Sequence, residues 1–384
     1  MIASPAAADA QPLRVLTFLH SFAPGGVERV ALRLHGAWRA SNVDSRLVMG
    51  RESGAMRAEW PGLEAEILGP APFSPARWQT LWMILRLPGV IRRIRPDVLF
   101  CAGNTYTVVA VMMKLLLRDR CPPVVAKMSN DLVRLDMSAP MRAAYRVWLR
   151  VQGRMLDRLV GMAPPMREEI AALMRAAPER IAIIDDPSLD EADVVRLEQA
   201  RRAAQSLPRG AGRRFVAIGR LTRQKNFALM IDAFALIARP QDHLVIVGEG
   251  AERAALEAQI ARLGLGAQVR LPGHLHPVDS ELCAGDALVL SSDYEGVPAV
   301  VAEALAAGLP VVATDCSVSM ADILGAGRFG LLVPTGDTAA LAAAMERIAA
   351  LPFDVVAAQD QARRFTLQLA SRRYIALMES AARE

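Results

Sequence analysis

The chain has little cysteine, no long apolar run and almost no lysine. Its four cysteines show no paired spacing, so we expect neither a disulfide framework nor a common zinc site. We expect reduced thiols, as in a cytoplasmic protein. The longest apolar stretch, residues 108–117, contains Lys114 and is shorter than the roughly 18 residues of a membrane span. The Ala-rich first dozen residues lack a preceding positive charge, which predicts a loose tail and not a secretory signal.

Because lysine is rare, arginine supplies most of the positive charge. This charge is unevenly divided between the two halves of the chain. Residues 1–184 carry a net charge of +10 and residues 185–384 a net charge of −5, and all five tryptophans lie in the first half. A basic half that carries the tryptophans favours an anionic surface or acceptor as its partner. An arginine-rich composition with tryptophans in the core would produce the same pattern, so both interpretations stay open.

The length of 384 residues, with 53% hydrophobic and 22% charged residues, predicts two globular domains with full cores. We expect one Rossmann-like domain over residues 1–190 and a helical linker over 191–212. A second Rossmann-like domain is expected over 213–355, followed by a helical segment, 356–384, that packs back on the first domain.

Short apolar runs alternate with helical patterns in both halves, which predicts an α/β fold of two doubly wound domains that face one cleft. The expected strands are residues 15–19, 96–100, 124–127, 159–162, 181–184, 215–219, 243–247, 269–271, 287–291 and 311–313.

The stretch Asp293–Pro310 reads DYEGVPAVVAEALAAGLP and places two glutamates eight residues apart. Proline suits a first helical turn, so we expect Glu295 on a loop and a helix that begins near Pro298. Glu303 then lies roughly 12 Å further along, and the two carboxylates can hold the two ends of an elongated polyol. The free backbone N–H groups at the helix start favour an anion between them, at Gly296, Val297, Pro298 and Ala299. The alternative is that Glu295 is a charged loop residue and Glu303 a solvated helix residue, and that neither binds a ligand.

A second motif lies upstream, where Gly219-Arg220-Leu221 is followed by Lys225-Asn226. Together the two motifs resemble those of retaining glycosyltransferases of family 4, which have the GT-B fold. The resemblance is clear over residues 215–337 and fainter over 15–186. It implies that Arg220 and Lys225 bind the diphosphate of a nucleotide sugar, Glu295 the sugar and Glu303 the ribose.

The resemblance implies a retaining glycosyltransferase in which Arg220, Lys225 and Glu295 act in catalysis. The expected donor is a nucleotide-diphosphate sugar, most often a UDP-sugar, with no further cofactor. The expected acceptor is a glycan or a lipid-linked sugar in the synthesis of envelope polysaccharide, lipopolysaccharide or glycolipid, and no nucleic acid is expected as partner. No Asp-x-Asp motif follows a predicted strand, which favours a metal-independent reaction. A sugar-nucleotide epimerase and a catalytically inactive binding subunit of the same fold are the alternatives.

The first half offers weaker candidates. Gly25 and Gly26 follow the first predicted strand, in a strand, turn and helix pattern that suits a phosphate or a plain tight turn. The family has a glycine-rich loop here that faces donor and acceptor, which implies that both glycines contact the donor. Many members carry a histidine near the point where this chain has Asn104, and Asn104 is expected on the acceptor side. Polar residues at the carboxyl end of the third predicted strand are expected on the acceptor side, namely Lys127, Asn130 and Asp131.

Two basic stretches predict a contact with an anionic membrane at its cytoplasmic face. The first runs from Arg77 to Arg95 and includes Trp78 and Trp82. The second is an expected helix over residues 141–158 in which arginine recurs every four residues from Arg142 to Arg158 and forms a spiralling stripe. Such a stripe needs solvent, carboxylates or anionic lipid, because like charges at this spacing repel. A solvated face is the alternative.

Overall fold

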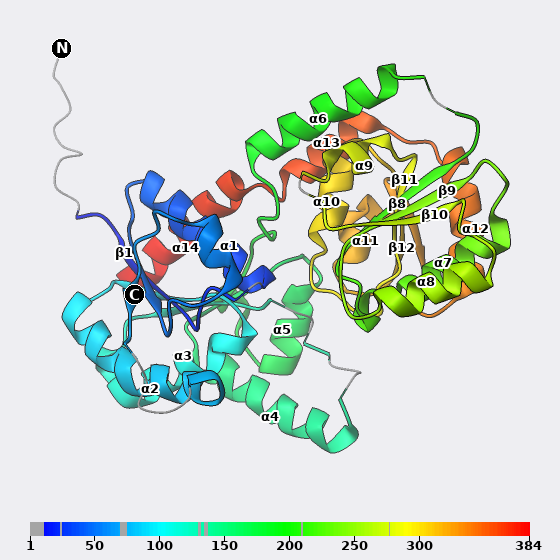
Figure 1. Cartoon of the computed structure of the whole chain (residues 1–384). Coiled ribbons are helices and arrows are strands. Elements are labelled where there is room, and N and C mark those ends of the chain that lie inside the picture. Colours follow the sequence, from blue (N-terminus) through cyan, green and yellow to red (C-terminus); the bar gives the residue numbers. More distant parts are fainter. Residues whose placement is uncertain are drawn as a thin grey trace, which may run out of the picture. The chain divides into compact units, whose positions relative to one another are not determined.

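The computed structural model describes residues 11–23, 25–69, 75–129, 132–133, 137–208, 210–275 and 277–384 (Figure 1). The chain divides into two compact units. The first comprises Met1–Met162, Arg167–Ile184 and Ala370–Glu384, and the second comprises Ala163–Met166 and Asp185–Leu369.

The first unit contains a parallel sheet with strand order β3-β2-β1-β4-β5-β6-β7. Its β4 and β5 are buried along their whole length, as expected for strands covered on both faces. The strands are β1 (Arg14–Leu19), β2 (Asp44–Met49), β3 (Glu66–Ile67), β4 (Val98–Cys101), β5 (Val124–Lys127), β6 (Arg158–Gly161) and β7 (Ile181–Ile183).

Helices cover both faces of this sheet, as Figure 1 shows. One face carries α1 (Gly26–Ala40) and α14 (Leu367–Arg383), and the other carries α2 (Pro75–Ile94), α3 (Thr107–Leu117) and α4 (Ala139–Met155). The buried Tyr374 of α14 packs edge-to-face against Trp38, with ring centroids 6.0 Å apart, and against Phe100, at 5.3 Å. Aromatic packing therefore anchors the end of the chain in the first unit. The short α5 (Met166–Met174) precedes β7.

The second unit contains a six-stranded parallel sheet with order β10-β9-β8-β11-β12-β13. One hydrophobic cluster packs α6, α9, α10, α11 and α13 on one face, and a second packs α7, α8 and α12 on the other. The strands are β8 (Arg214–Ile218), β9 (His243–Val247), β10 (Val269–Gly273), β11 (Ala287–Leu290), β12 (Val311–Thr314) and β13 (Gly330–Val333). The helices are α6 (Glu191–Ser206), α7 (Phe227–Ile237), α8 (Arg253–Arg262), α9 (Asp279–Ala284), α10 (Ala299–Ala306), α11 (Met320–Ile323), α12 (Thr338–Arg347) and α13 (Val355–Arg363).

Two parallel sheets with interleaved helices confirm the doubly wound α/β prediction. The predicted linker over residues 191–212 needs a correction. Residues 191–206 form α6, and the buried Val194 and Leu197 of this helix join the core of the second unit. Burial of this apolar stripe makes α6 an integral part of that unit, which begins at Asp185.

The predicted arginine stripe also needs a correction at its end. Helix α4 ends at Met155, and Arg158 lies in β6, where its side chain is only 12% exposed and forms an ion pair with Glu384. The helical stripe therefore consists of Arg142, Arg146, Arg150 and Arg154. Within the described ranges, no helix has both the length and the apolar character needed to cross a membrane. All four cysteines are free thiols.

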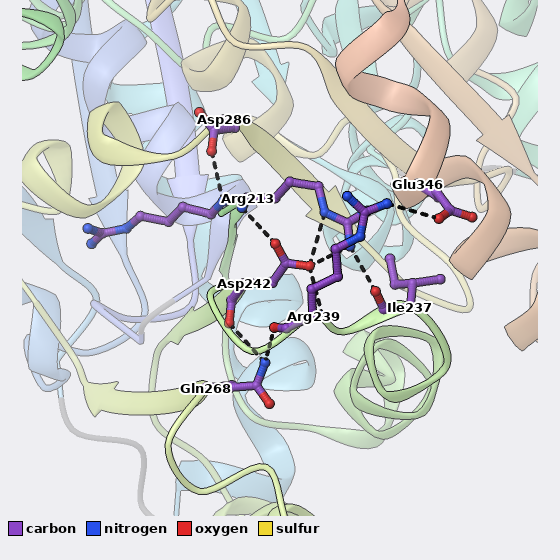
Figure 2. Close-up of polar contacts among 8 residues, drawn as sticks. Arg213, Ile237, Arg239, Asp242, Gln268, Asp286 and Glu346 are labelled. Atoms are coloured by element: carbon purple, nitrogen blue, oxygen red, sulfur yellow. Dashed lines mark hydrogen bonds and ion pairs between the residues drawn. The ribbon is translucent and has the colours of Figure 1, made fainter. Parts of the chain in front are cut away.

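A buried charge network fixes the amino-terminal edge of the second sheet (Figure 2). Asp242 is 1% exposed and accepts hydrogen bonds from the backbone N–H groups of Arg213 and Arg239, at 2.8 and 3.0 Å, and from Arg213 Nε at 3.1 Å. Burial alone would raise the pKa of Asp242, but these hydrogen bonds hold its pKa below the usual value. The network lies at the edge where the strands begin, so it supports the fold and leaves the opposite edge open for a site.

Candidate functional site

The two motifs of the second unit meet at the point where its strand order reverses. From β8 the chain proceeds to β9 and β10 on one side and returns to β11, β12 and β13 on the other. β8 and β11 are hydrogen-bonded neighbours, and the loops after their carboxyl ends carry Arg220 to Lys225 and Ser291 to Glu295. Open α/β sheets bind ligands in the crevice at such a switch point.

Lys225 and Glu295 form an ion pair at this point, although 70 residues separate them in the sequence. Lys225 Nζ lies 2.5 Å from Glu295 Oε1, and their side chains are 17% and 12% exposed. Ser292 Oγ donates a second hydrogen bond to the same carboxylate oxygen at 2.8 Å. Both charged groups are therefore held in place at a partly open position, and an ammonium group retains donors for a further anion.

Three further hydrogen bonds fasten the two loops to each other. Gln224 Nε2 donates to the carbonyl of Tyr294 at 2.8 Å, and Asn226 Nδ2 donates to Asp293 Oδ1 at 2.9 Å. Ser291 Oγ donates to the carbonyl of Lys225 at 2.9 Å. Asn226 adopts a left-handed conformation, with φ 46°, and caps α7 through its side chain. The motif asparagine is thus a structural residue that sets the course of the loop behind Lys225.

The segment after Glu295 leads into α10, whose N-cap is Pro298, as the sequence predicted. The Gly296 carbonyl accepts hydrogen bonds from Ser317 Oγ at 2.6 Å and Ser319 Oγ at 2.8 Å. Val297 packs into the core, Pro298 is buried and Ala299 is exposed. Glu303 lies in the last half of α10 and is partly exposed. A ligand could therefore meet the main chain of residues 296–299 and the exposed Ala299.

Arg220 is exposed and follows Gly219, which packs against the Lys225 side chain. A Cβ on Gly219 would lie 3.3 Å from Lys225 Cε. The neighbouring loop approaches even more closely, because a Cβ on Gly248 would lie 1.9 Å from the Gly219 carbonyl oxygen, and one on Gly250 would lie 2.3 Å from that of Leu221. These glycines brace the Arg220 loop by backbone packing.

The first unit has an analogous switch point between β1 and β4, and here Tyr106 holds Glu28. The Tyr106 hydroxyl donates to Glu28 Oε1 at 2.7 Å, and the His20 N–H contacts the Tyr106 oxygen at 3.4 Å. Burial, together with the charge of Glu28, raises the pKa of Tyr106, so the phenol stays protonated and remains a donor. Glu28 lies in the first turn of α1, where the helix dipole favours a carboxylate.

Glu28 changes the interpretation of the glycine loop. A Cβ on Gly25 would lie 2.1 Å from Glu28 Oε2, so the carboxylate rests directly against Gly25, while Gly26 has open space. Gly25 has an extended backbone, with φ −151°, so the glycine is required for space and not for conformation. A diphosphate beside Gly25 would be repelled by the carboxylate, so the structure does not support Gly25 and its neighbour Gly26 as phosphate ligands.

The residues predicted on the acceptor side have different structural roles. Asn104 Oδ1 accepts the Ser129 N–H at 2.9 Å, and the Asn104 N–H donates to Ser129 Oγ at 3.2 Å, so Asn104 braces the end of β5. Lys127 is the last residue of β5 and is only 2% exposed. This burial does not support contact with an acceptor. Asn130 and Asp131 lie outside the described residues.

Sequence reasoning missed Ser292, Ser317, Ser319, Glu28 and Tyr106. Ser292 could have been noticed, because it lies three residues before Glu295, but its role depends on the position of the carboxylate. The serines that hold the Gly296 carbonyl follow a different strand, and no local signal marks them. Among the described side chains, no three His, Cys, Asp or Glu residues gather as a metal site would require.

Two family models match the chain, one in each half. "Glycosyltransferase Family 4" matches residues 24–186, and "Glycosyl transferases group 1" matches residues 212–350. The group 1 match includes both strands of the β8/β11 switch point, and the family 4 match includes β4, Glu28 and Tyr106.

Curated relatives match over limited stretches. The amylovoran biosynthesis glycosyltransferase AmsD of Erwinia amylovora is 32% identical over 111 residues, which are 29% of this chain and 32% of that protein. A Campylobacter jejuni protein, named N-acetylgalactosamine-N,N'-diacetylbacillosaminyl-diphospho-undecaprenol 4-alpha-N-acetylgalactosaminyltransferase, is 35% identical over 118 residues, which are 31% of this chain and 32% of that protein. The chain thus spans about a third of these relatives' length.

Solved structures match over nearly the whole chain. Anabaena HepE in complex with UDP superposes with a TM-score of 0.73 and 19% identity, covering 96% of this chain and 100% of that one. At this identity the likeness shows the fold.

Proposed function

Because the chain belongs to glycosyltransferase family 4 and has the GT-B fold, we propose that it is a retaining glycosyltransferase with a nucleotide-diphosphate sugar as donor. The observation that carries the proposal is the Lys225–Glu295 pair at the β8/β11 switch point. A cation beside a carboxylate, both partly buried, suits a ligand that has an anionic group next to sugar hydroxyls.

In the proposed reaction, Arg220 and Lys225 bind the diphosphate and neutralise the charge that develops as it leaves. Glu295 accepts hydrogen bonds from the sugar and Glu303 from the ribose. The bond between the anomeric carbon and the diphosphate oxygen breaks, and a bond to the acceptor oxygen forms on the same face. The acceptor hydroxyl proton passes to an oxygen of the departing diphosphate. The two cations supply the electrostatic stabilisation, so we propose a metal-independent reaction.

We further propose a UDP-sugar as donor, because HepE, which has this fold, was crystallised with UDP. The proposed acceptor is a glycan or a lipid-linked sugar of a cell-envelope polysaccharide or lipopolysaccharide. The names of the two relatives support this setting, since one concerns amylovoran and the other a diphospho-undecaprenol substrate. The proposed location is the cytoplasm, at the inner face of the membrane, where such an acceptor would be met.

A thermal-shift panel of UDP-, GDP-, ADP- and dTDP-sugars tests the donor, because a ligand that binds the native state raises the melting temperature. We expect a UDP-sugar to give the largest rise, and its incubation with envelope lipid extract to yield UDP and a glycosylated product. An epimer of the donor as product would identify an epimerase, and binding without turnover would identify an inactive subunit. If no nucleotide sugar raises the melting temperature, the protein does not bind such a donor and the proposed function is refuted.

A further inference from the structure

Helices α2, α3 and α4 form one continuous covering of the first unit's sheet, and their charge is of one sign. α2 packs against α3, and α3 packs against α4 (Figure 1). None of the three helices contains an aspartate or a glutamate, whereas each contains arginine or lysine. We call their outward side the α2–α4 face. A solvated face usually mixes both signs of charge, so this composition requires another explanation.

The α2–α4 face also exposes large apolar side chains on every helix. Trp78 is 54% exposed and Leu85 is 64% exposed, and Leu81 lies between them at helical spacing, so α2 presents an apolar stripe to solvent. On α4, Val147 is 58% exposed. The other exposed apolar residues of the face are Val108, Leu115, Leu116, Met141 and Val151. Exposed apolar side chains that recur on three helices packed side by side indicate a surface that binds something.

Some cations of the face are already compensated. Lys114 forms an ion pair with Asp157 at 2.5 Å, and Arg93 forms one with Glu66. Arg86 is exposed and lies over the ring of Trp82, 5.3 Å from its centroid. Among the side chains of α2 and α4 that the structure describes, the remaining exposed cations are Arg92, Arg146, Arg150 and Arg154. These cations are interspersed among the exposed apolar side chains, with Val147 and Val151 next to Arg146 and Arg150.

We propose that the α2–α4 face binds the surface of an anionic lipid bilayer. Arginine head groups meet the anionic lipid phosphates while Trp78 and the exposed aliphatic side chains enter the boundary of the acyl region. A nucleic acid backbone would use the cations but not the leucines and valines. A second copy of this chain, joined through the same face, would place cations against cations. Of these three partners, only the bilayer uses both features. The proposal rests on the proposed function in one respect: a lipid-linked acceptor would explain why the protein binds a bilayer.

Co-sedimentation of the full chain with vesicles tests the proposal without any turnover. Phosphatidylcholine vesicles that contain phosphatidylglycerol should bind the protein at low salt, and vesicles of phosphatidylcholine alone should bind it poorly. Salt should release it, because the Debye length falls from about 10 Å at 0.1 M to about 3 Å at 1 M.

Two variants separate the charged and apolar contributions. Arg146→Glu, Arg150→Glu and Arg154→Glu together should lower partitioning onto anionic vesicles by about 100-fold or more, because each interfacial cation contributes about a fivefold factor. Leu81→Ser with Leu85→Ser should weaken binding at low salt, where the wild-type protein is retained. The matched control reverses three exposed arginines of the second unit, Arg202, Arg262 and Arg347, to glutamate. This control changes the net charge equally and should leave binding nearly unchanged.

The proposal is overturned if anionic vesicles fail to retain the wild-type protein at low salt, or if the control triple loses as much binding as the α4 triple. Retention by a DNA oligonucleotide but not by vesicles would also overturn it. Donor binding in the thermal-shift panel is independent of these outcomes, so a failure here leaves the proposed donor site standing.

Discussion

Replacement of Lys225 by methionine tests the candidate donor site most directly. Methionine keeps the length and apolar body of the side chain, and Glu295 keeps its hydrogen bond from Ser292 at 2.8 Å. The loop is also held by the Gln224 and Asn226 side chains, whose hydrogen bonds do not involve the ammonium group. The substitution therefore removes one positive charge and leaves the surrounding loop in place.

The expected loss follows from what a charged hydrogen bond contributes. Such a bond stabilises a complex by about 1.5–3 kcal/mol, which corresponds to about 10- to 150-fold in Kd. The Lys225 side chain is 17% exposed, so solvent screens it only in part. Isothermal titration should show that Lys225→Met weakens UDP binding by this factor while uridine binding changes less than twofold. Arg220→Ala should act in the same way.

Arg223 provides a matched control from the same loop. Its side chain is 94% exposed and lies 3.8 Å from Glu252, away from the pair. Arg223→Ala should leave the UDP affinity nearly unchanged. If Lys225→Met weakens uridine and UDP equally, or if Arg223→Ala matches its effect, then Lys225 is not a phosphate ligand.

Three further outcomes are expected. Transfer activity should persist in the presence of a chelator, and abolition by the chelator with rescue by Mg²⁺ or Mn²⁺ would refute the metal-independent reaction. Asp242→Ala should destabilise the second unit by about 3–5 kcal/mol in urea unfolding, because it leaves the partly buried Arg213 guanidinium without its carboxylate partner; a loss below about 1 kcal/mol would show that the network contributes little. Burial, aided by the charge of Arg39, lowers the pKa of His35 to about 4 from 6.5. Between pH 6.5 and about pH 4 the unfolded chain therefore binds a proton at His35 that the folded chain does not. The free energy of unfolding should fall by about 2 kcal/mol between pH 7 and pH 5, and it should fall less in His35→Gln. Equal declines in the two proteins would contradict this assignment.

The sequence alone determined the strands that are buried on both faces. Residues 124–127 and 243–247 were predicted with the bounds that β5 and β9 have, because a short apolar run between polar segments has few other ways to be buried. The start of α10 was predicted near Pro298, because proline suits a first helical turn, and Pro298 is its N-cap. Three strands were missed: β2, which begins with charged residues, the two-residue β3, and β13, which lies at the sheet edge.

The sequence also determined which residues carry the family motifs, since these lie in short contiguous stretches. It could not determine what each side chain contacts. Lys225 and Glu295 meet because β8 and β11 are neighbours, and Tyr106 meets Glu28 because β1 and β4 are. Neighbouring strands are chosen by the packing of the whole sheet, which no local pattern records. The same packing buries Lys127 and assigns Arg158 to a strand. It also makes α6 part of the second unit and attaches α14 to the first. Each of these outcomes depends on apolar surface that distant residues supply.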